Sequence, residues 1–178
     1  MNDLSLHIID IIQNSVSAGA THISLSIEDS LKNDYLKISI KDNGKGMDQE
    51  QVKSLSDPFF TSRTTRRVGM GIPLFKQAAE QTGGSLEVNS VIGIGTEVVA
   101  SFVNSHIDRA PLGDVANSFI LMVSANPNID FELKYDKDGN VYEFNTVEVR
   151  GVLEDLPLND PSVIRMLTSM IDENIKDL

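Results

Sequence analysis

The pattern of apolar and polar residues predicts a mixture of helices and strands in the first hundred positions. Near the N-terminus, apolar residues recur every three or four positions up to Val16, which is the spacing of one buried helix face. Four later segments alternate apolar with polar residues, as half-buried strands do. The expected elements are helices over 3–17 and 71–82 and strands over 21–28, 35–42, 85–90 and 96–103. This order predicts an α+β fold in which helices cover one face of a largely antiparallel sheet.

The rest of the chain predicts a smaller unit of the same kind. Its expected elements are a helix over 112–125, a hairpin within 129–149 that turns at Asp138 and Gly139, and a closing helix over 160–178. Pro111 and Gly113 favour a boundary before this unit. We therefore expect one domain over residues 1–104 and a small α+β extension over 105–178. So small an extension buries little surface alone, so we expect it to pack on the first domain or on a partner.

Composition narrows the classes of function. A formal net charge of −11 disfavours general attraction to nucleic acid or to an anionic membrane surface. The absence of cysteine excludes disulfides, thiolate metal sites and cysteine nucleophiles. No leader-like segment and no apolar run of about 18 to 20 residues occurs in the sequence. We expect a soluble cytoplasmic protein that binds neither nucleic acid nor membranes.

Charge is distributed unevenly. Residues 104–178 hold 14 carboxylates against 6 lysines and arginines, whereas no carboxylate interrupts residues 58–79. This acid-free segment contains FFTSRTTRRVGMGIPLF, with three arginines, three threonines and two glycines. Guanidinium groups, hydroxyls and the free amides of a helix entrance are all suited to holding a phosphate. The G-x-G pattern alone is weak, because it lacks the lysine and Ser/Thr of a phosphate loop.

Two further stretches hold candidate chemistry. Asp10 and Asn14 lie four positions apart on the first predicted helix, and such a carboxylate–carboxamide pair can hold a divalent cation or orient a water. A solvated helix face is the alternative. His7 joins the same stripe, where either a proton relay or a packing or surface role fits it. In KDNGKGMD, Asp42 can accept from an exocyclic amine such as that of adenine.

Each glycine-containing stretch also has a simpler interpretation. A tight turn with positive backbone dihedrals at Asn43 and Gly44 would explain the first, although a simple hairpin does not require the second glycine, Gly46. A hairpin turn would equally explain GIGTEV, which places Gly95 and Thr96 at the mouth of the last strand of the first domain. These alternatives stay open when each stretch is taken alone.

In their order along the chain, these stretches resemble the motifs of the GHKL superfamily of ATP-binding domains. This superfamily includes sensor histidine kinases, anti-sigma-factor kinases, mismatch-repair ATPases and type II topoisomerase ATPase domains. The resemblance covers about residues 4–103 and implies the Bergerat fold, a two-layer α/β sandwich. The matching motifs are DIIQNSVSAGATHI for the N box, DNGKGM for the G1 box, DPFFTSR for the F-box region, VGMGIPL for the G2 box and GGSLEVNSVIGIGTEV for the closing strands.

The resemblance implies a role for each matching residue. Asn14 would coordinate the Mg²⁺ that bridges the phosphates, and Asp42 would bind the adenine amino group with support from Thr96. Gly44 and Gly46 would let the nucleotide approach. The full set of expected ATP-binding residues is Asn14, Asp42, Gly44, Gly46, Met47, Thr61, Arg63, Gly69, Met70, Gly71, Ile72 and Thr96. The expected catalytic residues are Asp10 and Arg63, and the expected metal ligand is Asn14.

Three departures from the superfamily pattern concern turnover more than binding. Asp10 stands where hydrolysing members carry a glutamate as general base. Ser17 replaces an aspartate of the mismatch-repair proteins. GMGIP stands in place of the commoner G-L-G-L pattern, and its Pro73 has no backbone N–H to donate.

We therefore expect a Mg²⁺- and ATP-binding kinase-like protein that transfers the γ-phosphate to a protein partner, on histidine or serine, or hydrolyses ATP slowly. The alternative is a nucleotide-gated interaction module without productive chemistry. The sequence does not name the partner, and it leaves a homodimer open.

Overall fold

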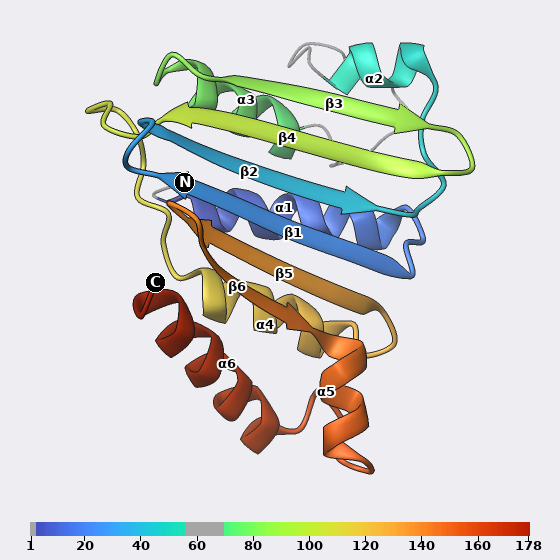
Figure 1. Cartoon of the computed structure of the whole chain (residues 1–178). Helices are drawn as coiled ribbons and strands as arrows, with labels where there is room; N and C mark the ends of the chain where they lie inside the picture. Colours follow the sequence, from blue (N-terminus) through green and yellow to red (C-terminus); the bar gives the residue numbers. More distant parts are fainter. Residues whose placement is uncertain (1–2, 56–69) are drawn as a thin grey trace.

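A six-stranded sheet with helices packed on one face forms the molecule (Figure 1). The computed structural model describes residues 3–55 and 70–178. The helices are α1 (Leu4–Ser17), α2 (Gln49–Leu55), α3 (Gly71–Glu80), α4 (Val115–Ala125), α5 (Thr146–Leu153) and α6 (Pro161–Lys176). The strands are β1 (His22–Ser30), β2 (Tyr35–Asp42), β3 (Ser85–Val91), β4 (Gly95–Val103), β5 (Asp130–Lys137) and β6 (Asn140–Asn145).

The sheet has the strand order β3-β4-β2-β1-β5-β6. Four of its five neighbouring pairs are antiparallel, which confirms the largely antiparallel α+β sheet expected from the sequence. The exception is β1 with β5, which run parallel from the pair His22↔Asp130 to the pair Asp29↔Lys137. A parallel pair needs a long crossover connection, and here the whole of β2 to α4 lies between the two strands.

Alternation along the strands puts the core between the sheet and the helices. In β1 the buried apolar residues are Ile23, Leu25 and Ile27, and the residues between them face the side of the sheet that the helices leave uncovered. Helix α1 lies along the middle of the sheet, with α3 on one side and α4 on the other (Figure 1). Its N-terminus is capped by Asp3, whose carboxylate accepts from the backbone N–H of Leu6.

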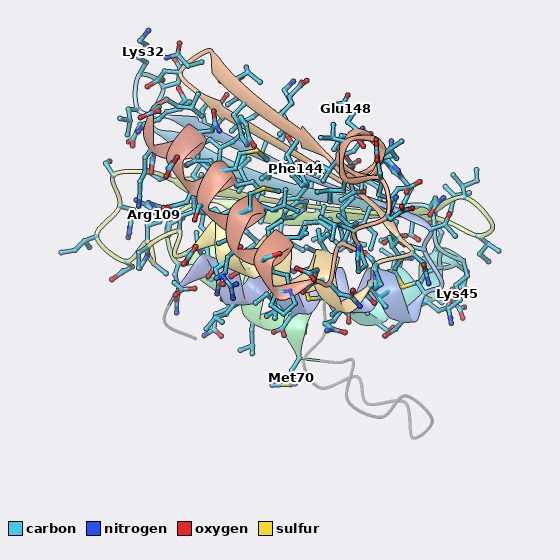
Figure 2. The ribbon with its side chains drawn as sticks, turned by 90° about the horizontal axis from the view of Figure 1, so that it is seen from below. Lys32, Lys45, Met70, Arg109, Phe144 and Glu148 are labelled. Carbon is cyan, nitrogen blue, oxygen red and sulfur yellow. The ribbon has the colours of Figure 1, made fainter. Side chains whose placement is uncertain are left out.

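The extension continues this sheet and core. Helix α4 packs against α1, and α6 packs against α4. Phe119 of α4 makes edge-to-face contacts with Phe131 of β5 and Phe144 of β6, with ring centroids 5.9 and 5.8 Å apart. Phe144 lies in the interior of this layer (Figure 2). Residues 1–104 and 105–178 share one sheet and one hydrophobic cluster. Their division into two domains stays a prediction.

Two helices were not predicted. Helix α2 follows the candidate G1 loop, where no element was expected. Residues 146–149 were placed in the hairpin but belong to α5, and the prediction was wrong there. The chain leaves the strand because the Asn145 side chain accepts from the backbone N–H of Val147, which caps the helix, while the buried Thr146 hydroxyl accepts from the N–H of Phe131.

Replacing Phe131 by alanine tests whether the extension and the first domain unfold together. Phe131 is fully buried between β5 and α4, so Phe131→Ala should lower the free energy of unfolding by about 3 to 5 kcal/mol. Urea denaturation, followed by circular dichroism, should show one transition moved to lower urea. Val152→Ala, at an 83 % exposed position, is the control and should change stability by less than about 0.5 kcal/mol. Two separate transitions, with only one moved, would show independent units instead.

Candidate functional site

The carboxylate of Asp42 lies at the end of β2 and is held by donors from three elements. Its Oδ2 accepts from the Ser15 hydroxyl of α1 at 2.6 Å. Its Oδ1 accepts from the backbone N–H of Gly44 at 2.8 Å and from that of Thr96, in β4, at 3.3 Å. The residue is only 9 % exposed. Each of these partners among the described residues donates, so the two carboxylate oxygens act as acceptors here.

The loop after β2 is tied to both of its neighbours. The backbone N–H of Lys45 donates to the carbonyl of Ala18 at the end of α1, and Gly93 donates to the carbonyl of Lys45 from the β3–β4 turn. The Asn43 side-chain oxygen accepts from the backbone N–H groups of Thr21 and His22. The loop is thereby held beside Asp42 without any ligand.

This packing explains the two glycines of the loop. A Cβ on Gly46, where φ is 69°, would lie 2.0 Å from the carbonyl oxygen of Val91, and a Cβ on Gly44 would lie 2.8 Å from the Cβ of Ala18. The alternative of positive dihedrals at Asn43 and Gly44 is wrong, since in this loop only Gly46 has a positive φ. The protein's own contacts are thus sufficient to require glycine at both positions.

Thr96 and Met47 meet at a serine of the neighbouring strand. The hydroxyls of Thr96 and Ser90 are 2.7 Å apart, and Ser90 Oγ also accepts from the backbone N–H of Met47 at 2.8 Å. Thr96 therefore supports Asp42 through its backbone N–H, while its hydroxyl bonds to Ser90. Gly95 precedes it with φ 144°, and a Cβ there would lie 2.0 Å from the Asp42 carbonyl oxygen.

Asp10 and Asn14 share one face of α1, and α3 begins next to them. Both side chains are partly exposed. A Cβ on Gly71, the first residue of α3, would lie 3.3 Å from the Cβ of Asp10. The structure therefore brings Asp10 to the entrance of α3. The contact is this close because Gly71 has no side chain.

The entrance of α3 offers backbone donors. The first hydrogen bond of the helix runs from Leu74 N–H to the Met70 carbonyl, so the N–H groups of Gly71 and Ile72 lie ahead of it, and Pro73 has none. Within residues 70–80, no side chain caps this end. Met70 is 56 % exposed and projects away from the sheet on the helix side, as Figure 2 shows. Thr61, Arg63 and Gly69 lie outside the described residues.

His7 packs beside this face. Its ring stacks on Phe75 of α3, with centroids 5.1 Å apart and planes 13° apart, and it is 5 % exposed. Its buried Nδ1 finds no hydrogen-bond partner among residues 3–55 and 70–178. Burial lowers the pKa of His7 below its usual value of 6.5, and the nearby Asp10 carboxylate opposes this effect less strongly. The contacts are those of the packing role that the sequence left open.

Sequence reasoning missed Ser15 and Ser90, although Ser15 left a signal. It falls on the apolar stripe of α1, after Ile8, Ile11 and Ile12, where all three neighbours are buried. A polar side chain on a buried stripe requires a buried partner, and Asp42 is that partner. Ser90 gives no such signal, because it occupies one of several polar positions on a half-exposed edge strand.

Two hollows among the described residues lie elsewhere in the molecule. One, of about 190 Å³, is formed by the turns after β1 and β5, and the other, of about 360 Å³, lies on the uncovered face of the sheet beside α5. Neither is lined by Asp10, Asn14 or Asp42. We therefore define the candidate site by the hydrogen bonds of Asp42, by the G1 loop after β2 and by the entrance of α3.

Over residues 3–55 and 70–178, no group of three or more His, Asp or Glu side chains is arranged to hold a metal ion. In the same ranges, no helix has the length and apolar character needed to cross a membrane.

Comparison with known families gives one match over this part of the chain. The sequence model described as histidine kinase-, DNA gyrase B-, and HSP90-like ATPase matches residues 2–105. The matched segment contains every element of the candidate site, from α1 to β4. It ends close to the residue at which the sequence pattern predicts the extension to begin.

Individual relatives and one solved structure agree with this match. Sporulation kinase C of Bacillus subtilis is 30 % identical over 95 residues, covering 53 % of this chain and 22 % of the relative. Sensor protein kinase FleS of Pseudomonas aeruginosa is 32 % identical over 108 residues, covering 61 % and 26 %. The chain thus spans about a quarter or less of these relatives. The MutL ATPase domain of Aquifex aeolicus, solved with ADP, has a TM-score of 0.54 at 15 % identity, over 86 % of this chain and 70 % of that one.

The buried imidazole of His7 predicts a pH dependence of stability. The folded protein holds His7 neutral, whereas the unfolded chain binds a proton as the pH falls below about 6.5. Stability that is present above about pH 6.5 is therefore lost progressively as the pH falls below that value. In His7→Phe, which keeps an aromatic ring against Phe75, the slope of unfolding free energy against pH should be smaller there, by up to about 1.4 kcal/mol per pH unit. Equal slopes for the two proteins in urea titrations would contradict the assignment.

Proposed function

Because the chain belongs to the histidine kinase-, DNA gyrase B-, and HSP90-like ATPase family, we propose that it binds Mg²⁺·ATP at Asp42 and the α1–α3 face and transfers the γ-phosphate to a protein partner. Slow hydrolysis of ATP is the same reaction with water as acceptor. The names of two relatives, a sporulation kinase and a sensor protein kinase, favour a protein acceptor. The cytoplasm, where ATP is available, is the location proposed with this function.

The hydrogen bonding of Asp42 is the observation that carries the proposal. All three of its partners donate, so the free lone pairs of the carboxylate can only accept. Adenine offers an exocyclic amino donor, whereas guanine presents a carbonyl oxygen at the corresponding position. A buried fixed acceptor therefore selects the adenine base.

The phosphates are expected at the other end of the site. Asn14 offers a carboxamide oxygen on the partly exposed face of α1, which suits a Mg²⁺ ion that also binds phosphate oxygens. When bound, this ion would neutralise phosphate charge. The N–H groups of Gly71 and Ile72, at the positive end of α3, would donate to the phosphates.

Asp10 is the residue of the described chain that we place at the reacting end. In the transfer, a nucleophilic nitrogen or oxygen of the acceptor, or a water, forms a bond to the γ-phosphorus while the bond to the β,γ-bridging oxygen breaks and ADP leaves. The Asp10 carboxylate orients this nucleophile and, for a hydroxyl or water, accepts its proton. Its position beside Gly71 supports this role, because Gly71 begins α3, at the end of the site where the phosphates would lie.

A nucleotide-gated interaction module is the second candidate, and the identity of Asp10 favours it. The side chain is one methylene shorter than the glutamate that the resemblance implies for hydrolysing members. Binding would then close the site without turnover, and the partner surface would change with nucleotide. Activity measurements on the protein with ATP bound separate the two candidates.

Replacing Asp42 by asparagine should abolish nucleotide binding, because the amide can no longer act only as an acceptor. Wild-type protein at about 100 times its Kd for ATP should gain roughly 2.7 kcal/mol of stability with Mg²⁺ present. Thermal melts of Asp42→Asn should show less than about 0.5 kcal/mol of gain, and the exposed control Asp155→Asn should match wild type. No gain in wild type would refute the proposed function, and an undiminished gain in Asp42→Asn would refute the site.

Replacing Asp10 by asparagine should separate binding from turnover. ATP affinity should change little, while ADP release, or phosphate transfer to a captured partner, should fall about 10²-fold or more because the carboxylate no longer orients the nucleophile. The measurement is ADP formation at saturating ATP. Unchanged turnover in the variant would remove Asp10 from the mechanism. A wild type that binds ATP but produces neither ADP nor a phosphorylated partner would favour the gated module.

A further inference from the structure

We propose that Ser15 is a positioning residue that sets base selectivity by aiming the Asp42 carboxylate. This inference rests on the proposed function, since it concerns how the same site would recognise a nucleotide. No sequence motif pointed to it, and the hydrogen bond of 2.6 Å between the Ser15 hydroxyl and Asp42 Oδ2 is its starting observation.

The two oxygens of Asp42 are held differently. Oδ1 is bound by two backbone N–H groups, from Gly44 and Thr96, which no side-chain substitution removes. Among the described residues, Ser15 is the donor that holds Oδ2. Ser15 therefore fixes rotation of the carboxylate about its Cβ–Cγ bond, and with it the direction in which the remaining lone pair of Oδ2 points.

The serine is itself fixed by its place in the fold. It is 3 % exposed on the inner face of α1, and its hydroxyl also lies 3.4 Å from the Ile11 carbonyl. Helix geometry restricts a serine there to few rotamers, so the hydroxyl has little freedom to turn away from Asp42.

Successive residues of α1 then serve the two ends of the nucleotide. Residues along a helix are rotated by about 100° from one another, so Asn14 faces the partly open side while Ser15 faces the buried carboxylate. One rigid turn of helix therefore fixes the metal ligand relative to the base acceptor. The spacing between the phosphate and base ends of the site depends on this turn.

The test is the ratio of affinities for two nucleotides that differ only in the group that Asp42 contacts. ATP carries the 6-amino donor, and purine riboside 5′-triphosphate lacks it. In Ser15→Ala the affinity for ATP should fall about tenfold, as expected for loss of a hydrogen bond to a charged group, while that for purine riboside triphosphate should change little. Binding is measured by calorimetry with Mg²⁺, well below the melting temperature of each protein. Ser15→Thr, which keeps the hydroxyl, should keep the wild-type ratio.

Controls separate positioning from a structural role. Ser118→Ala removes a 6 % exposed serine from α4, on a helix outside the site, and should leave both affinities unchanged. An affinity ratio in Ser15→Ala equal to that of wild type, whether both affinities fall equally or neither falls, would overturn the inference. If wild type binds neither nucleotide, the proposed function fails, and the inference fails with it.

Discussion

The buried carboxylate of Asp42 is the constraint on which the rest of the site depends. A polar side chain that is only 9 % exposed must be matched by hydrogen-bond partners, and the chain provides donors from α1, from the loop after β2 and from β4. Those elements are far apart in the sequence, so the carboxylate can be satisfied only when the sheet, the helix and the loop are all in place. The same arrangement leaves Asp42 as a fixed acceptor, which is the property that adenine recognition requires. In the proposed function, stability and adenine recognition would place the same demand on this one side chain.

Much of this architecture was predictable because its periodicities are strong. The stripe on α1, the alternation in the central strands and the hairpin at Asp138 and Gly139 follow from local spacing, and the structure confirms them. Short-range sequence patterns do not predict the parallel pairing of β1 with β5, because nothing in either strand specifies which strand pairs with it. Helix α5 was also missed. It begins where the Asn145 and Thr146 side chains make hydrogen bonds, and an apolar–polar alternation does not reveal such bonds.

For the candidate site, the sequence named residues that the structure brings together, and the binding roles assigned to them stay predictions. It named Asp42, Gly44, Gly46 and Thr96, and the family match covers all of them. The reasons differ in part from those expected. Gly46 is required by the carbonyl of Val91, and the Thr96 hydroxyl bonds to Ser90, leaving its backbone N–H to support Asp42. Ser15 was overlooked because a motif records residue types and not the partner that a buried hydroxyl must find. The roles assigned to Thr61, Arg63 and Gly69 stay predictions from the resemblance.

The central claim is that Asp42 and Asn14 contact opposite ends of one nucleotide, and a crystal structure with Mg²⁺ and a non-hydrolysable ATP analogue tests it most directly. The account predicts the adenine amino nitrogen within about 3 Å of Asp42 Oδ2 and the metal ion bound to the Asn14 carboxamide oxygen. An ordered nucleotide whose base lies away from Asp42, or whose metal has no contact with Asn14, would contradict it.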